Sequence, residues 1–357
     1  DLIVFRAKML AEKTAGTLSL IADCLSGTDF SDTKRLQDLV NEYRNDFDES
    51  VIPSGHDFAS IRASSFFNRS KAVDEIWNGI TQLFTAHSFT DMNALAEHFR
   101  SILAQIKEGG AILHITADKE SLASALPLFK DFVQTNHLKA LKPRKKTDDN
   151  DFFKMLNLEG QDVDVEHNKN TEVFIVPSEV GFSSCAINAA GWKTKESEAE
   201  SILSHWMSTN ILWERLRTIG GAYGAYASND SVEKVFTLTS YRDPTPYKTL
   251  SVFTSCLKKM AEQPIDHESL EKCITGCYSK EIQPRSPLNR GYTGFLRCIY
   301  GITNEDRAEN LKLLFSVKKE DIQAALKRLE ANKMNCFNVC ITGKKDGCGG
   351  KIILLPL

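Results

Sequence analysis

The spacing of apolar residues changes near residue 166, and no other feature of the sequence constrains the fold as strongly. Before that point apolar residues recur at helical spacing, as Leu18, Ile21 and Leu25 do, and a single short run, AILHIT at 111–116, has the character of a strand. After it, strand patterns stand at both ends of the segment, with long helical patterns between them. The chain is therefore predicted to have a helix-rich first part and an α/β second part.

Three stretches follow from this change of pattern. Residues 1–138 are predicted to be a helix-rich domain whose few strands leave it short of a complete α/β domain, so we expect it to be truncated at its start. Residues 139–165, which begin KALKPRKKTDDNDF, carry a basic run and then an acidic one, and are predicted to be a linker. Residues 166–357 are predicted to be a complete α/β domain of the α+β type, with helices packed on one face of a mainly antiparallel sheet.

The second domain has the clearest individual elements. A helix is predicted over 196–217, and Asn229 and Asp230 are expected at the turn of a β-hairpin. The strands are expected at 171–176, 182–190, 222–230, 234–241, 336–343 and 351–357.

The overall composition narrows the class of protein. The net charge is −3 and 42% of the residues are hydrophobic, as in an ordinary soluble globular protein, so we expect neither a nucleic-acid nor a membrane partner. No apolar run reaches the roughly 18 residues of a membrane span. The opening residues, DLIVFRAKML, have no initiating Met and no signal-peptide pattern, so we expect a processed piece of a longer protein.

Nine cysteines without a CxxC pair favour a reducing compartment, either the cytoplasm or an organelle matrix. Cys336, Cys340 and Cys348 lie near one another in sequence, but their spacing matches no usual zinc pattern. CFNVCITG alternates like a strand, so these cysteines are predicted to be structural, and no metal site is expected in this chain.

No complete catalytic apparatus is present in the sequence. The eight histidines form neither HxxEH nor HExxH, and there is no GxSxG, GxxxxGK[ST] or GxGxxG motif. The run GHDFASIRASSFF, with Gly55, His56 and Arg62, is predicted to start a helix, and the role of these three residues stays open.

The stretch LRTIGGAYGAY at 216–226 places an arginine and a tyrosine on either side of a flexible joint. Gly220 and Gly221 permit positive φ, so the chain can turn sharply from helix to strand. Arg217 and Tyr223 could then converge on one point as hydrogen-bond donors to a peptide carbonyl, a carboxylate or a developing oxyanion. The alternative from the residues alone is a buried tyrosine and a solvated arginine.

The stretch LWERLRTIGGAYGAYAS resembles the Arg/Tyr signature in the C-terminal half of the pitrilysin/insulysin-type inverted zinc metallopeptidases, above all the presequence protease and falcilysin subgroup. SGHDFASIRASSFF, TSYRDPTPYKTLSVF and SPLNRGYTGFLRCIYGITNEDR resemble further stretches of that half. The resemblance therefore runs from near residue 1 to near residue 325.

This resemblance implies a clamshell of four related metallohydrolase-like domains that encloses short unfolded peptides and degrades them. Residues 1–138 would be the remainder of the third domain, and 166–357 the fourth. Arg217 and Tyr223 would bind the substrate backbone and the transition state, with Gly221 and Ala222 also contacting the substrate. Zn²⁺ would be bound by the HxxEH motif of the N-terminal half, so this chain alone is expected to be inactive. Its partners would be peptide substrates and the N-terminal half of the same polypeptide. The alternative is a non-catalytic structural or partner-binding relative.

Overall fold

The computed structural model describes residues 2–141, 154–156, 162–165, 170–344 and 348–357. The chain forms two compact units that do not follow its order. The first unit contains residues 1–42, 89–147 and 284–303, and the second contains residues 43–88, 148–283 and 304–357. Most of the predicted linker at 139–165 lies outside the described residues, although a strand begins at Asp162.

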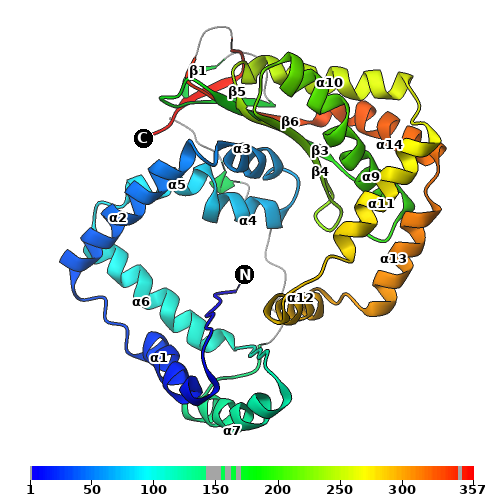
Figure 1. Ribbon diagram of the computed structural model, residues 1–357. Helices are drawn as coiled ribbons and strands as arrows, with labels where there is room; N and C mark the ends of the chain where they lie inside the picture. Colours follow the sequence, from blue (N-terminus) through cyan, green and yellow to red (C-terminus); the bar gives the residue numbers. More distant parts are fainter. Residues whose placement is uncertain (1, 142–153, 157–161, 166–169, 345–347) are drawn as a thin grey trace. The chain divides into compact units, whose positions relative to one another are not determined.

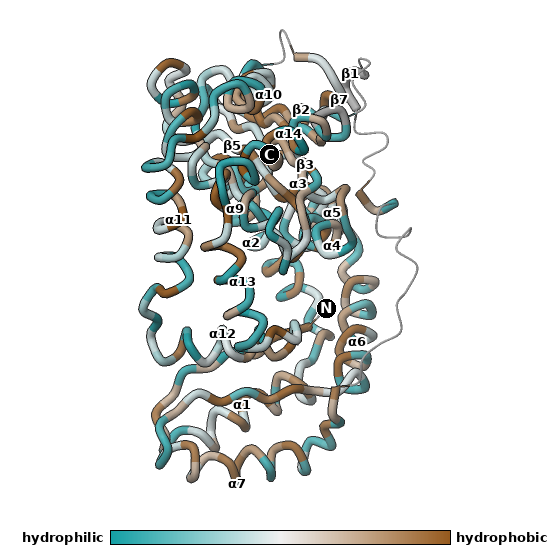
Figure 2. The backbone as a smooth tube through the Cα atoms, turned by 90° about the vertical axis from the view of Figure 1, so that its right-hand side faces the viewer, coloured by the Kyte–Doolittle hydropathy of each residue, from teal (hydrophilic) through white to brown (hydrophobic). Residues whose placement is uncertain are grey.

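The first unit is helical. Its four complete helices are α1 (Thr14–Ser26), α6 (Met92–Gly109), α7 (Lys119–Thr135) and α12 (Pro287–Tyr300). It also contains the short 3₁₀ turn η1 (Ala11–Lys13) and the beginning of α2 (Thr33–Val51). Polar and apolar residues alternate along α6 and α7 (Figure 2), as expected of helices that bury one face. A small core joins α2 to α6 through Leu36, Val40 and Leu95.

The strand predicted at 111–116 is absent, and this prediction is wrong. Ala111 makes a single parallel bridge to Ala140, and the rest of AILHIT belongs to no strand or helix among the described residues. A strand requires a neighbour that satisfies its backbone N–H and C=O groups, and β-propensity alone does not supply one.

The second unit is built on a seven-stranded mixed sheet in the order β1-β7-β2-β6-β3-β5-β4. Its strands are β1 (Asp162–Val165), β2 (Thr171–Ile175), β3 (Gly181–Asn188), β4 (Gly224–Asp230), β5 (Val235–Asp243), β6 (Phe337–Thr342) and β7 (Lys351–Leu354). β2 pairs in parallel with β6 and β7, whereas the other neighbours are antiparallel. The sheet is therefore mainly antiparallel, as predicted.

The helices of residues 166–357 cover one face of this sheet, as predicted, whereas helices from residues 55–88 cover the other face (Figure 1). The helices α3 (Gly55–Ser64) and α5 (Ile80–Ser88) lie against that other face, and α4 (Arg69–Asn78) packs against these two helices. A Cβ atom added to Gly55 would lie 2.2 Å from the Phe182 ring, so the glycine allows α3 to approach β3 closely. Residues 43–88, which the sequence pattern assigns to the helix-rich first domain, share a compact unit with the sheet. The division into family domains stays a prediction.

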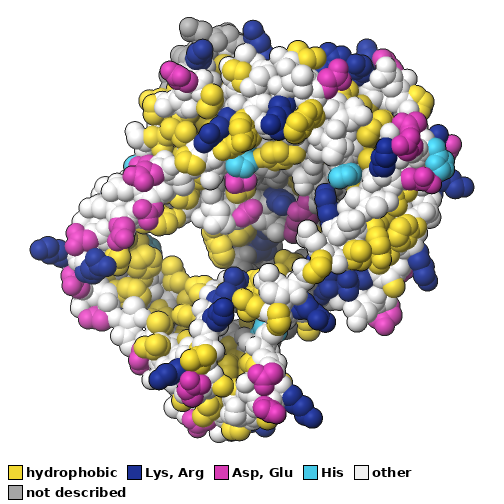
Figure 3. Space-filling view, viewed as in Figure 1, with side chains coloured by type: hydrophobic (Ala, Val, Ile, Leu, Met, Phe, Trp, Pro, Cys, Tyr) yellow, Lys and Arg dark blue, Asp and Glu magenta, His cyan; other side chains and the backbone are white. Residues whose placement is uncertain are grey.

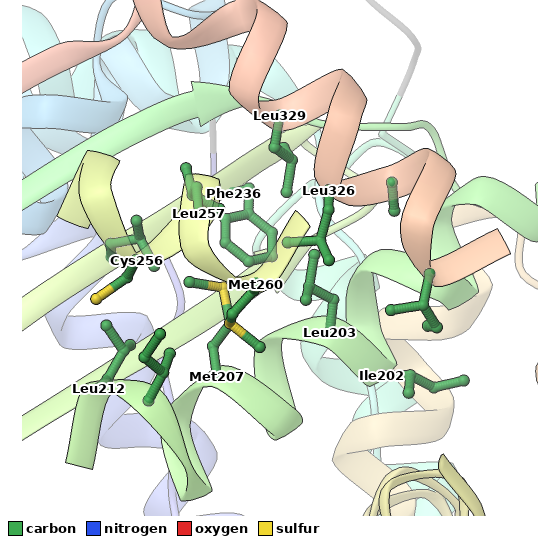
Figure 4. Packing of buried hydrophobic residues seen from close by; sticks show 14 of the residues in the cluster. Ile202, Leu203, Met207, Leu212, Phe236, Cys256, Leu257, Met260, Leu326 and Leu329 are labelled. Atoms are coloured by element: carbon green, nitrogen blue, oxygen red, sulfur yellow. The ribbon is translucent and has the colours of Figure 1, made fainter. Parts of the chain in front are cut away.

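The opposite face carries the larger core. It is covered mainly by α9 (Lys195–Thr209), α10 (Pro246–Glu262), α11 (His267–Glu281), α13 (Asn304–Ser316) and α14 (Lys319–Ala331), and the short η3 (Asn332–Asn335) leads into β6. Figure 4 shows Met207 of α9, Met260 of α10 and Leu326 of α14 converging on Phe236 of β5. All four side chains are at most 4% exposed, so this core fixes α9 against the sheet.

No described helix is long and apolar enough to cross a membrane. Acidic and basic side chains are interspersed over the face of the protein that Figure 3 presents.

Candidate functional site

The candidate site begins where the long helix ends. A single helix was predicted over 196–217, but α9 stops at Thr209, and a π-helix, η2 (Trp213–Ile219), follows it. Within η2, Trp213 and Arg217 lie on the same side, and the Arg217 Cζ atom is 4.0 Å from the centre of the Trp213 ring. Short π-helical segments occur frequently at functional sites. The wider turn here stacks the guanidinium of Arg217 on an exposed indole.

The two glycines of the joint act differently. Gly221 has φ +79°, which favours glycine, whereas Gly220 has φ −80° and needs no special conformation. Gly220 is required for space, because a Cβ atom there would lie 2.7 Å from the carbonyl oxygen of Leu216. The prediction of a sharp glycine turn is confirmed, but only Gly221 adopts the positive φ.

Gly221 and Ala222 close the end of the π-helix. The N–H of Gly221 donates to the Arg217 carbonyl over 3.2 Å, and the N–H of Ala222 donates to the Leu216 carbonyl over 2.9 Å. The side chain of Ala222 is buried in the core beneath the joint. Both N–H groups are thus already used, so the geometry favours a shaping role for these two residues. Their predicted contact with a substrate stays a prediction.

Tyr223 stands at the start of the next strand with its ring in solvent. It is 66% exposed, and its N–H donates to the carbonyl of Arg242 over 3.3 Å. The Arg217 Cζ atom lies 5.7 Å from the centre of the Tyr223 ring, so the joint does bring the arginine and the tyrosine together. The alternative of a buried tyrosine is excluded by the exposure of its ring.

The polar groups of this pair are available to a ligand. Among the described residues, neither the guanidinium of Arg217 nor the hydroxyl of Tyr223 has a hydrogen-bond or ion-pair partner. A guanidinium and a phenol hydroxyl that face solvent together suit a carbonyl or an oxyanion, because both groups donate hydrogen bonds.

Three further aromatic side chains adjoin this pair, and they were not predicted from the sequence. Tyr241 of β5 packs edge-on against Tyr223, with ring centres 5.8 Å apart, and His56 of α3 packs edge-on against Tyr241 at 4.7 Å. Tyr226 lies 6.0 Å from His56, and burial raises the pKa of the Tyr226 hydroxyl. The dense run around His56 was the available signal, but nothing in the sequence showed that its partners lie on β4 and β5.

His56 also contains an unusual polar atom. Its Nδ1 atom is buried and has no hydrogen-bond partner among the described residues, whereas Nε2 lies 3.5 Å from a carboxylate oxygen of Asp57. A buried polar atom without a partner is costly, and the His56 ring is packed among the rings of Phe182, Tyr226 and Tyr241.

Arg62, the other charged residue of that run, has a different environment. It is 1% exposed, and its guanidinium donates to both carboxylate oxygens of Glu172, over 2.6 and 2.9 Å. It also donates to Glu75, to the hydroxyl of Thr81 and to the carbonyl of Leu156. Arg62 therefore fastens α3 to β2 and to α4, and it lies away from the solvent that a substrate would occupy.

The described residues contain no group of three or more His, Cys, Asp or Glu that could hold a metal ion. Cys340 lies in β6 and is fully buried, as predicted from the alternation around it. Cys336 accepts a hydrogen bond from the thiol of Cys185, which lowers the pKa of Cys336 to about 7. The predicted absence of a metal site in this chain stays a prediction.

Two family models match the chain. The model described as "PreP C-terminal domain" matches residues 170–344, and a model of the region associated with subfamily C of the M16 peptidases matches residues 1–88. Arg217 and Tyr223 lie within the first match, and His56 and Arg62 lie within the second.

Three known proteins illustrate the similarity. Presequence protease 1, chloroplastic/mitochondrial, of Arabidopsis thaliana is 24% identical over 96% of this chain, which covers 31% of that protein. A conserved protein from Enterococcus faecalis has a similar fold, with a TM-score of 0.60, 14% identity, and coverage of 94% of this chain and 75% of that one. Pitrilysin gives a TM-score of 0.55 and 12% identity over 96% of this chain and 35% of its own. The chain thus spans about a third of the length of its presequence-protease relative.

Proposed function

Because this chain belongs to the M16 peptidase family, in the branch of the presequence proteases, we propose that it is the C-terminal, substrate-binding half of a zinc-dependent endopeptidase. The enzyme would degrade short unfolded peptides inside a closed chamber. Its partners would be those peptides and the N-terminal half of the same polypeptide.

One observation carries this proposal. The Arg217 Cζ atom lies 5.7 Å from the centre of the Tyr223 ring, and both side chains face solvent. In the described part of the chain, neither the guanidinium nor the phenol hydroxyl has a hydrogen-bond or ion-pair partner. An exposed tyrosine and an exposed arginine held by a tight glycine joint contribute little to a core. They are better explained by an external ligand that accepts hydrogen bonds.

The proposed roles follow from the chemistry of each side chain. Arg217 would hold a carbonyl of the bound peptide, with its guanidinium oriented by the Trp213 ring beneath it. The hydroxyl of Tyr223 would donate to the oxyanion that develops on the scissile carbonyl. Gly221 and Ala222 would shape the joint that aims these donors.

The residues that the structure describes do not fit a zinc ion, since no three metal-ligating side chains come together among them. We propose that any zinc of the full-length enzyme is bound by residues outside this chain, and that this chain alone hydrolyses no peptide. We propose a reducing compartment such as an organelle matrix, because the described cysteines form no disulfide bonds. The names of the presequence-protease relatives from Arabidopsis thaliana and Aspergillus oryzae place those two proteins in mitochondria or chloroplasts. No observation favours the non-catalytic alternative.

The test uses the natural polypeptide that contains this chain, loaded with zinc, and one quenched fluorescent peptide. Tyr223→Phe should lower kcat by about 10²–10³ with little change in KM, because it removes one oxyanion donor and keeps the ring. Arg217→Ala should raise KM as well as lower kcat, because it removes a contact made throughout the reaction. Tyr300→Phe is the matched control, since Tyr300 is 63% exposed on α12. A folded, zinc-loaded Tyr223→Phe enzyme with the wild-type kcat would refute the proposal.

A further inference from the structure

A β-bulge lies next to the candidate site. β3 and β5 pair in regular register up to Ser183 and Ser240, but the next pair is Gly181 with Asp243. Two residues of β5, Tyr241 and Arg242, therefore oppose a single residue of β3. Arg242 has φ +47°, a left-handed conformation that is uncommon for any residue except glycine, asparagine and aspartate.

At the bulge, Asp243 is buried whereas the preceding residue, Arg242, is exposed to solvent. Asp243 is buried, and its carboxylate accepts hydrogen bonds from the N–H of Thr245 over 2.8 Å and from the hydroxyl of Thr249 over 2.5 Å. Arg242 is exposed, and its Cζ atom lies 5.4 Å from the centre of the Tyr241 ring. The carboxylate of Asp243 is thus bound to Thr245 and Thr249 at the start of α10. The guanidinium of Arg242 instead faces solvent over the Tyr241 ring.

This guanidinium adjoins the Arg217–Tyr223 pair. The carbonyl of Arg242 accepts the N–H of Tyr223, and the rings of Tyr223 and Tyr241 are in edge-to-face contact. Each of the two adjacent tyrosine rings therefore has a guanidinium beside it, Arg217 at Tyr223 and Arg242 at Tyr241. In the described part of the chain Arg242, like Arg217, has no hydrogen bond or ion pair to its guanidinium.

We propose that Arg242 is a specificity-determining residue that binds a carboxylate of the peptide substrate. This inference rests on the function proposed above and adds a preference to it. A strained arginine that is held in a bulge, faces solvent and lacks an acidic partner in the described part of the chain suits a ligand that brings its own negative charge. The carboxylate would belong either to an acidic side chain near the scissile bond or to the C-terminus of the peptide.

The left-handed backbone of Arg242 makes a sharp test possible. Arg242→Gly removes the guanidinium and fits φ +47° better than arginine does, so the bulge should survive the substitution. Lys234→Gly is the matched control, because Lys234 is also an exposed cation with positive φ, at +57°, and lies in the turn between β4 and β5. Arg242→Lys keeps the charge without the planar fork of donors.

For each variant, the measurement is the kcat/KM for a peptide with the carboxylate divided by the kcat/KM for the same peptide without it. This ratio cancels any general loss of activity. One arm compares peptides with Glu or Gln at each position flanking the cleaved bond. The other arm compares a free with an amidated C-terminus. The wild-type enzyme should prefer the carboxylate by about threefold to tenfold in one arm. Arg242→Gly should bring that ratio to about one, Arg242→Lys should retain part of it, and Lys234→Gly all of it.

The inference is overturned if the wild-type enzyme shows no preference in either arm, or if Arg242→Gly keeps it. Its failure can be told apart from failure of the proposed function. If Tyr223→Phe is slow but the wild-type enzyme has no carboxylate preference, the proposed function stands and Arg242 does not recognise the substrate. A silent Tyr223→Phe substitution would instead remove the catalytic role of the joint.

Discussion

Arg62 and Arg217 lie in one compact unit and have opposite surroundings. Arg62 is buried, and its guanidinium contacts Glu172, Glu75, Thr81 and the carbonyl of Leu156. Arg217 is exposed and rests on an indole ring, and its guanidinium has no hydrogen-bond or ion-pair partner in the described part of the chain.

The difference separates a structural arginine from a candidate functional one. A buried guanidinium is tolerated only when its hydrogen bonds and charge are satisfied inside the protein, and once they are satisfied it has nothing left to offer a ligand. An exposed guanidinium without an acid nearby contributes little to stability but keeps all its donors. The same residue type therefore predicts a large stability effect at one position and an activity effect at the other.

The largest expected effect is the loss of stability in Arg62→Met. This substitution leaves the buried carboxylate of Glu172 without its two hydrogen bonds, and breaking a buried ion pair in this way typically costs about 3–5 kcal/mol. Urea denaturation followed by circular dichroism measures the free energy of unfolding. Arg62→Met combined with Glu172→Gln should recover part of the loss, because the unpaired charge is removed.

If Arg62→Met alone does not fold, the double variant still tests whether the loss of stability comes from the unpaired charge of Glu172. A double variant no more stable than the single one, or a loss below about 1 kcal/mol in Arg62→Met, would mean that water reaches the cluster.

A smaller effect, which depends on pH, is expected for Glu75. Burial raises the pKa of Glu75 from 4.5 to about 7, although Arg62 and Thr81 oppose the shift. Its Oε2 atom is buried, has no hydrogen-bond partner in the described part of the chain, and is where the added proton would reside. Because the folded-state pKa lies above the unfolded value, the stability that Glu75 contributes is fully present below about pH 4.5 and is lost as the pH rises through about 7.

Glu75→Gln removes this titration. The wild-type protein should lose stability relative to Glu75→Gln between about pH 5 and about pH 7, and urea denaturation at intervals across that range measures the difference. Glu108→Gln, on the exposed surface of α6, controls for the removal of one carboxylate. Parallel stability curves for Glu75→Gln and the wild-type protein would show that Glu75 is already ionised at the lower end of that range.

The two arginines also show how far the sequence could lead. The convergence of Arg217 and Tyr223 was predictable, because both lie within seven residues and a glycine joint limits where the chain can go. The partners of Arg62 were not predictable, because Glu172 is 110 residues away in sequence and lies on β2. Local patterns predict local geometry, whereas long-range pairs depend on how elements pack.

The same limit explains the other differences from the predicted fold. The helix over 196–217 was predicted from apolar spacing, but spacing does not register the change to a π-helix at Trp213. The run GHDFASIRASSFF was predicted to start a helix, and α3 begins there. The sequence did not assign α3, α4 and α5 to the unit that contains the sheet, since an apolar stripe does not say which surface covers it. The sheet was predicted more fully because alternation and β-hairpin signals act over short distances.

The smallest expected effect is the change in stability of Arg217→Ala. The substitution removes one stacking contact with Trp213, which for an exposed pair contributes about 0.5–1 kcal/mol, and leaves no buried acid unpaired. The melting temperature should therefore stay close to that of the wild-type chain, while Arg62→Met falls far below it. Because Trp213 is 49% exposed and loses its stacked guanidinium, its fluorescence should change more in Arg217→Ala than in Arg242→Gly. A loss of stability in Arg217→Ala as large as that in Arg62→Met would remove the distinction between the two arginines. It would also mean that the joint needs Arg217 for folding, and the reduced activity of that variant could then no longer be attributed to substrate binding.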